Sequence, residues 1–508
     1  MINETLPNLL LGFATAFTPH NLVYAIVGCF IGTMVGVLPG VGPLAGISLL
    51  LPFTFGIDPT SGMILLCSVY YGAMYGGSTT SILMRIPGEA ASVMTCIDGY
   101  AMAQSGRAGP ALAICAIGSY IAGTFAVIGL MFVAPPLARF ALRFGPPEYF
   151  SLLVLGLFVL GYMTGGSMAK NIAMIALGLL LGTVGMDFIS GYFRFSYGMV
   201  AFGDGISIVP VVVGLFGISE IMATAGDPGR PETIKPRLRD LIPSREEIKR
   251  SVAPIGRGTL LGFFIGIIPG SAHIISTFIS YAIERRVSKH PERFGKGAIE
   301  GVAGPESANN AASTGALIPM LALGVPTGPI AAVLLAALIV HGVNPGPQFI
   351  TEQPVIFWGL VGSMYLGNFV LLILNLPLIG IFVNLLRIPY RYLYPIVLTF
   401  CILGVYAANY TTTDLAVMLA MGVLGYVLRK FNFDAAPVVL GLVLSPIIEN
   451  GFRQSLAMSH GSYAIFLTRP ISLTFLVGTA LLILLTFRSQ SRKKAAWREK
   501  LTQAEKDG

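Results

Sequence analysis

Apolar stretches long enough to cross a membrane recur along the 508-residue chain, and short polar segments separate them. A helix that spans a bilayer needs about 20 consecutive, mostly apolar residues. A shorter apolar segment within residues 1–20 either spans marginally or lies in the interface. The predicted spans are 62–84, 108–135, 148–164, 168–186, 206–224, 299–322, 355–386, 391–409, 412–429, 435–449 and 468–487. The chain is therefore predicted to be an all-α polytopic membrane protein with about 12 transmembrane helices.

Two further apolar stretches are too long for one ordinary span, and each has Pro-Gly near its middle. Residues 22–55 contain Pro39-Gly40, and residues 252–283 contain Pro269-Gly270. Proline removes an amide donor and glycine frees the backbone, so each stretch is expected to break into two short helices. At membrane depth such a turn must be covered by protein or by a watery cavity. Two kinked helices would be the simpler interpretation, but the duplication favours a pair of re-entrant helical hairpins.

The duplication extends beyond the hairpins. Each is followed by a span that a small polar cluster is expected to break (76–81 and 307–315), and then by a Pro-containing break (85–89 and 324–328). Four more spans follow in each half, which predicts an internal repeat of hairpin, broken helix and scaffold helices. The predicted segments are an N-terminal helix (1–20), a first repeat (21–225), a basic linker (226–251), a second repeat (252–466), and a C-terminal helix with a basic tail (467–508).

Charge predicts how the two halves are oriented. The net charge of +8 is concentrated in the linker, in the loop after the second hairpin and in the tail, and basic loops remain in the cytoplasm. Residues 20–60, around the first hairpin, contain no Lys or Arg and are expected outside. The result is an inverted-topology repeat, an arrangement that many secondary transporters use. Arg139, Arg143 and Arg453 fall outside on this assignment and are its exceptions.

Composition and motifs exclude several classes of function. A mean hydropathy of +0.77 with 11% charged residues leaves no soluble domain of comparable size. The sequence has no His-Glu-x-x-His, no Gly-rich nucleotide loop ending in Lys-Ser/Thr and no credible nucleophile–base pair, so no enzyme and no organic cofactor are expected. Asp204, in Phe-Gly-Asp-Gly, faintly resembles an intramembrane aspartyl protease motif but lacks a partner aspartate. The cysteines have no metal-like spacing, and no nucleic-acid partner is expected.

The polar clusters and the Pro-Gly turns are the candidate binding elements. Hydroxyls, amides and freed backbone groups can replace the hydration shell of a carboxylate or of sodium, and helix N-termini attract carboxylates. The structural alternative is that these small residues only allow close helix packing. Ionisable groups at membrane depth are functional candidates, here Arg85, Glu89, His273 and Glu306, although Arg85 and Glu89 are also explained as boundary anchors. The candidate substrate- and ion-binding residues are Gly40, Gly77, Ser78, Thr79, Thr80, Gly270, Ser271, Asn309, Asn310, Ser313, Thr314 and Thr327.

Five long motifs carry a family resemblance. Residues 36–43 and 70–78 resemble the large membrane subunit of the tripartite tricarboxylate transporters, and residues 304–311, 324–326 and 341–347 are similar to its second-half signatures. The resemblance covers nearly the whole chain. One departure is visible, because Arg85 stands where a neutral polar residue is expected before Ile-Pro-Gly.

The resemblance implies a multi-pass protein of the bacterial inner membrane. It also implies two partners, a periplasmic solute-binding protein and a small four-helix membrane subunit. The expected activity is uptake of a di- or tricarboxylate, or a related organic acid, by symport with sodium or protons. The two hairpin units are expected to form a moving, elevator-like core. The alternative is a channel or passive pore for small anions, although a pore would carry polar residues along whole spans rather than in two clusters.

Overall fold

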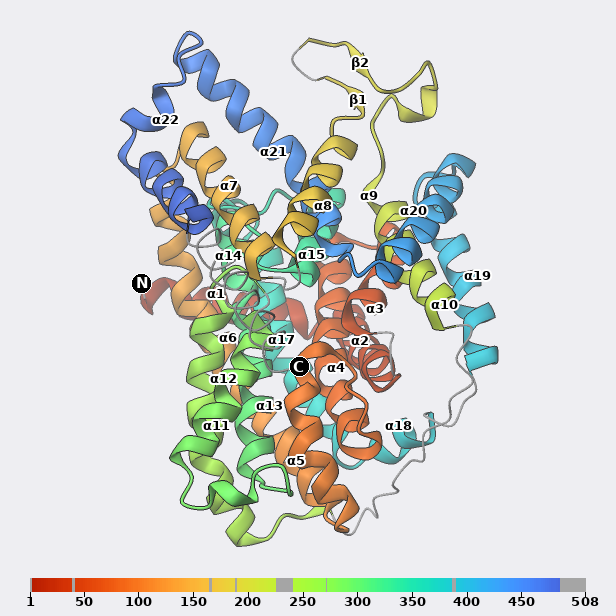
Figure 1. Cartoon of the computed structure of the whole chain (residues 1–508), viewed down its shortest axis with the longest axis vertical. Helices are drawn as coiled ribbons and strands as arrows, with labels where there is room; N and C mark the ends of the chain where they lie inside the picture. Colours follow the sequence, from red (N-terminus) through yellow and green to blue (C-terminus); the bar gives the residue numbers. More distant parts are fainter. Residues whose placement is uncertain are drawn as a thin grey trace, which may run out of the picture.

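The computed structural model describes residues 2–38, 42–163, 167–187, 190–224, 241–270, 272–385 and 390–484, and helices dominate it (Figure 1). The first half begins with six helices: α1 (Ile2–Ala16), α2 (Pro19–Val37), α3 (Gly42–Leu50), α4 (Pro59–Met84), α5 (Val93–Gln104) and α6 (Ala108–Ala141). The corresponding part of the second half contains α11 (Arg245–Gly266), α12 (Ala272–Val287), α13 (Glu300–Gly315), α14 (Leu317–Leu323), α15 (Pro329–Val340), α16 (Phe349–Glu352) and α17 (Pro354–Asn375). These helices form the middle and lower parts of Figure 1, where α11, α12 and α13 lie side by side.

The remaining helices form the upper and right-hand parts of Figure 1, and we call them the scaffold helices. They are α7 (Pro146–Met163), α8 (Met168–Leu181), α9 (Ile208–Val212), α10 (Ser219–Thr224), α18 (Ile379–Leu385), α19 (Tyr390–Asn409), α20 (Thr412–Lys430), α21 (Ala436–Met458) and α22 (Ile465–Thr468). A π-helical segment, Val213–Ile218, joins α9 to α10. In the described ranges, α2, α6, α17 and α20 are long and apolar enough to cross a membrane, and other apolar helices are shorter. The predicted membrane character is thus supported, while the predicted count of about 12 spans stays a prediction.

Both Pro-Gly stretches fold as two helices, α2 with α3 and α11 with α12. Residues 39–41 and Ser271 lie outside the described residues, so the candidate sites Gly40 and Ser271 cannot be placed. Helix α11 begins at Arg245, within the stretch assigned to the linker. A capping box explains this start, because Ser244 Oγ accepts from the Glu247 amide and the Glu247 carboxylate accepts from the Ser244 amide.

A stripe of three glycines packs the first helix of each hairpin against the following polar helix. On α2, Gly28, Gly32 and Gly36 face the carbonyl oxygens of Leu65, Val69 and Ala73 on α4. On α11, Gly258, Gly262 and Gly266 face those of Gly304, Ala308 and Ala312 on α13. A methyl group on any of these glycines would lie 2.2–2.7 Å from the facing oxygen, so only glycine permits this approach. In both pairs, successive glycines along the first helix face successive residues along the second, so α2 runs parallel to α4 and α11 runs parallel to α13.

The expected breaks inside the polar clusters are wrong. Helix α4 continues unbroken through residues 76–81, and α13 continues through residues 307–315. Backbone groups in a membrane must be bonded within the structure, and the cluster hydroxyls also bond within the helix. Ser81 Oγ donates to Gly77 O and Ser313 Oγ to Asn309 O, both at 2.9 Å. These polar residues therefore present side chains, rather than unwound backbone, to their surroundings.

The Pro-containing breaks occur where they were expected, and the two have the same geometry. Helix α4 ends at Arg85, which is left-handed with φ 60° and ψ 23°, and α14 ends at Gly324, with φ 70° and ψ 20°. Each is followed by an apolar residue and a proline, Ile86-Pro87 or Val325-Pro326. The left-handed conformation is natural for glycine and strained for arginine.

The all-α prediction needs one correction. Within the described chain, β1 (Gly185–Met186) pairs antiparallel with β2 (Phe193–Arg194), and the resulting hairpin lies at the top of Figure 1, above α8 and α9. The predicted span 168–186 consequently ends early, at Leu181, because Gly185 adopts a positive φ of 109° and starts the strand.

Candidate functional site

The polar residues of α4 and α13 meet in the interior, where the two helices run antiparallel. Ser78, near the end of α4, donates from Oγ to Glu306 Oε1 on the first turns of α13 at 2.5 Å. Two turns earlier on α4, Tyr70 lies near Ser313, two turns later on α13. The later part of one helix thus faces the earlier part of the other, and these side chains are buried.

Glu306 accepts hydrogen bonds from three helices around it. Besides Ser78, Thr95 on α5 donates its hydroxyl to Oε2 at 2.8 Å. Asn310, one turn along α13, donates from Nδ2 to Oε1 at 3.4 Å and to Ser119 Oγ on α6 at 2.7 Å. Only 1% of the surface of Glu306 is exposed, so this carboxyl is held entirely by neutral hydroxyl and amide groups.

Glu89 brings a second carboxyl to the same place from the segment after α4. Its Oε1 accepts from Asn309 Nδ2 at 3.2 Å, while its buried Oε2 has no hydrogen-bond partner. The carboxyl rests on Gly77, where a methyl group would lie 1.6 Å from Oε2. Glycine at position 77 is therefore required for Glu89 to lie here. Asn309 Oδ1 is also buried without a partner, which leaves two unpaired acceptor oxygens at one contact.

We call Glu89, Glu306 and the residues that contact them (Gly77, Ser78, Thr95, Asn309 and Asn310) the carboxyl pair site. It includes four of the predicted binding residues. Beside it is a small cavity of about 10 Å³, lined in part by Ser78, Thr79 and Ser119. This volume is close to the least that a single water needs.

Other predicted residues that the structure describes make packing contacts. Thr80 donates to Val37 O at 2.7 Å and so joins α4 to α2. At the tip of the second hairpin, the Gly270 amide donates to Thr327 O at 2.7 Å, and Thr327 donates from Oγ1 to Ala316 O at 3.0 Å. Thr314 is buried, and its hydroxyl has no hydrogen-bond partner among the described residues. Whether these residues also bind a ligand stays a prediction.

Sequence reasoning missed three side chains that build or brace the site. Thr95 and Ser119 bond to its carboxyl and amide groups from α5 and α6. Asp98, fully buried on α5, accepts at Oδ1 from the amides of Gly295, Gly297 and Ala298 at 2.8–2.9 Å. A carboxylate in the apolar stretch 93–104 was the signal that could have revealed Asp98. Arg85 is exposed, and its guanidinium carbon lies 5.8 Å from the centre of the Tyr100 ring.

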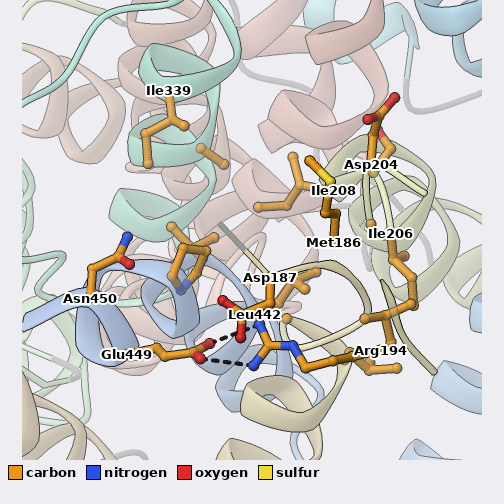
Figure 2. Close-up of a pocket in the computed structure, with 18 of the residues that line it drawn as sticks. Met186, Asp187, Arg194, Asp204, Ile206, Ile208, Ile339, Leu442, Glu449 and Asn450 are labelled. Carbon is orange, nitrogen blue, oxygen red and sulfur yellow. Dashed lines mark hydrogen bonds and ion pairs between the residues drawn. The ribbon is translucent and has the colours of Figure 1, made fainter. Parts of the chain in front are cut away.

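A larger cavity, of about 400 Å³, lies between α15 and the scaffold elements α8, α9, α21 and the β-hairpin. Figure 2 shows Arg194 of the β-hairpin facing Glu449 of α21, a bidentate pair at 2.8 and 3.2 Å. Arg453 donates to Asp187 at 2.7 Å and lies 3.4 Å from Glu449. This pairing neutralises the charge of Arg453, which is one of the three exceptions to the orientation predicted from loop charge.

Comparisons with known proteins agree on one family. The model of the Tripartite tricarboxylate transporter TctA family matches residues 22–440. The uncharacterized 52.8 kDa protein in the TAR-I ttuC' 3' region of Agrobacterium vitis is 47% identical over 97% of this chain and 98% of its own length. An uncharacterized protein in the TAR-II ttuC' 3' region of the same organism is 46% identical over 42% of this chain and 89% of its own length. No solved structure matches the chain.

Proposed function

Since the chain belongs to the tripartite tricarboxylate transporter TctA family, we propose that it is the permease subunit of a binding-protein-dependent secondary transporter. It takes up a di- or tricarboxylate, or a related organic acid, by cation symport across the bacterial inner membrane. A periplasmic solute-binding protein delivers the substrate, and a small four-helix membrane subunit completes the complex. The observation that carries this proposal is the carboxyl pair site, a buried polar centre built jointly by both halves of the chain.

An inverted-topology repeat accounts for this centre. Each half packs a glycine-striped helix parallel to its polar helix, α2 with α4 and α11 with α13. The two polar helices run antiparallel where they meet, as the Ser78–Glu306 contact requires. Equivalent units that cross a membrane in opposite senses give this relation, and transporters commonly bind substrate at such a repeat interface.

A moving core is the mechanism that this arrangement favours. In this mechanism the two hairpins with α4, α5, α13, α14 and α15 move as one body around the carboxyl pair site, and the later spans near 108–224 and 355–449 form the static scaffold. The cavity of about 400 Å³ occupies part of the boundary between α15 and the scaffold, so the two bodies are incompletely packed there. Close to the site only about 10 Å³ is open, which suits alternating access better than a continuous pore.

The proposal is tested in proteoliposomes that contain the chain, its small subunit and its binding protein. Uptake of radiolabelled citrate and other di- and tricarboxylates is measured with and without imposed proton and sodium gradients. Accumulation of an organic acid against its gradient is expected only when the binding protein is present. Uptake that never exceeds equilibrium, and that does not depend on the binding protein, would indicate a passive pore instead.

The moving core is tested by joining it to the scaffold. Ile339→Cys on α15 and Asn450→Cys on α21 place thiols on two walls of the larger cavity, where a cleavable bifunctional reagent can link them. Uptake should stop on crosslinking and return after cleavage, whereas each single-cysteine variant treated alike should keep its activity. Full-rate uptake with the link intact would leave local gating at the hairpin tips as the better account.

A further inference from the structure

We propose that Glu306 and Glu89 form the proton-binding site that couples substrate uptake to the proton gradient. The inference rests on the proposed function and adds the identity of the coupling cation and of the groups that carry it. A proton from the outer side converts a carboxylate of the pair to a carboxylic acid, and the acid releases that proton to the cytoplasm.

The first argument is that the two carboxyls have no cationic partner. Within the described parts of the chain, the buried acids Glu284 and Glu148 bind Arg257 and Arg469. Buried Asp98 is compensated instead by three backbone amides and the hydroxyl of Tyr281. No ion pair reaches Glu89 or Glu306, and their bonded partners are hydroxyls and amides. Two uncompensated negative charges within one buried site are strongly unfavourable, so this closed arrangement requires an added positive charge.

The second argument is that two buried acceptor oxygens lack a hydrogen-bond donor. Glu89 Oε2 and Asn309 Oδ1 are both buried acceptors without a donor. A proton on the Glu89 carboxyl adds an O–H donor at this contact, which neither group otherwise possesses. Glu306 can likewise carry a proton, because the hydroxyls of Ser78 and Thr95 can accept as well as donate.

The third argument separates a proton from a sodium ion. Hard cations need several oxygen ligands arranged around an open position. The cavity beside Ser78 has a volume of about 10 Å³, and the hydroxyl and amide groups around Glu306 are already directed at its carboxyl oxygens. A proton needs no such volume. The site as built therefore accommodates protonation without rearrangement.

The two glutamates differ in their access to solvent, which gives the proton a path. Glu306 is enclosed on all sides, whereas Glu89 is partly exposed as a residue although its carboxyl oxygen Oε2 is buried. Glu89 also belongs to the turn between α4 and α5 rather than to a long helix. Glu89 is thus placed to exchange the proton with solvent, and Glu306 to hold it during the movement of the core.

Few other groups near the pair can bind or attract the proton. On the elements around the pair the titratable side chains include Tyr70, Tyr75, Cys96, Cys115 and Asp98, and Arg85 is the cation near Cys96. Asp98 is already held by three backbone amides and the hydroxyl of Tyr281. Tyrosines and thiols without activation remain neutral at physiological pH. The carboxyls are therefore the groups that change charge in the working range.

The experiment uses the reconstituted complex of the Proposed function, with a pH-sensitive dye inside the liposomes. Wild type should acidify the lumen as substrate enters, in the absence of sodium. For Glu306→Gln, a neutral mimic of the protonated acid, substrate exchange between two loaded compartments is measured as well, so that acidification is expressed per substrate moved. Its substrate-linked acidification should fall at least tenfold, and accumulation driven by a pH gradient should be lost. Glu89→Gln should show the same loss, and its uptake should depend less steeply on pH than the uptake of wild type.

The control is Glu148→Gln, which neutralises a buried glutamate of the scaffold that has an arginine partner. It should retain acidification and accumulation. The inference is overturned if Glu306→Gln and Glu89→Gln both accumulate substrate with a normal proton-to-substrate ratio. It is also overturned if wild-type uptake follows a sodium gradient without acidification, in which case the proposed transport function still stands. Absence of any organic-acid uptake by wild type would instead remove the proposed function and this inference with it.

Discussion

Replacing Gly262 with alanine should destabilise the protein by forcing α11 away from α13. The added methyl carbon would lie 2.2 Å from Ala308 O and 2.7 Å from Ala308 Cα, both of which are backbone atoms that cannot rotate away. A carbon atom packs at about 3.5 Å or more from its neighbours, so the two helices must separate by roughly 1 Å along this line. Overpacking of this kind typically costs about 1–3 kcal/mol.

Gly256, on the same helix, provides the matched control because a methyl group there meets nothing within 4 Å. Both substitutions raise the helix propensity of α11 equally, so the difference between them isolates the packing cost of about 1–3 kcal/mol. Each variant is purified in detergent and heated with a thiol-reactive dye, which reports unfolding because all five cysteines are buried. Gly262→Ala should melt at a clearly lower temperature than Gly256→Ala. Equal melting temperatures would refute the close helix approach that the stripe implies.

Two further predictions concern orientation and the site. Gly56 is exposed with open space around it, and Lys289 is exposed as well. A membrane-impermeant thiol reagent should label Gly56→Cys only from the periplasm and Lys289→Cys only from the cytoplasm. Labelling of both from one side would mean a parallel repeat. Thr79→Ala and Asn309→Ala should reduce uptake by the equivalent of about 1–3 kcal/mol while the amount of inserted protein, measured by immunoblot, stays the same. Unchanged uptake by both variants would move the binding site away from the α4–α13 contact.

Local chemistry explains which parts of the fold the sequence could predict. Pro-Gly in a long apolar stretch predicts that the stretch breaks into two helices. The ends of α4 and α14 are explained by a residue with positive φ, followed by an apolar residue and a proline. The second pattern is hard to see at Arg85, because arginine rarely adopts the positive φ that Gly324 adopts readily.

The continuity of α4 and the composition of the site could not be predicted in the same way. Gly76-Gly77-Ser78 has poor helix propensity, so the sequence suggested a break, but packing of the α2 glycines on one face of α4 keeps the backbone helical. Thr95 and Ser119 lie on other helices and gave no local signal of their partners. Glu89 was interpreted both as a candidate and as a boundary anchor, and only the contact with Gly77 shows its carboxyl pointing inward.

The glycine stripes also show that the two polar clusters are not equivalent positions of the proposed repeat. Gly36 faces Ala73 and Gly266 faces Ala312, so an alignment by these contacts places Asn309 level with Tyr70 rather than with Ser78. In a parallel repeat, clusters at different heights would not meet. Because α4 and α13 run antiparallel, the late cluster of one helix reaches the early turns of the other, where Glu306 lies. In the proposed repeat, hydroxyls from one half therefore lie against a carboxyl from the other, so that two similar halves would form an asymmetric site.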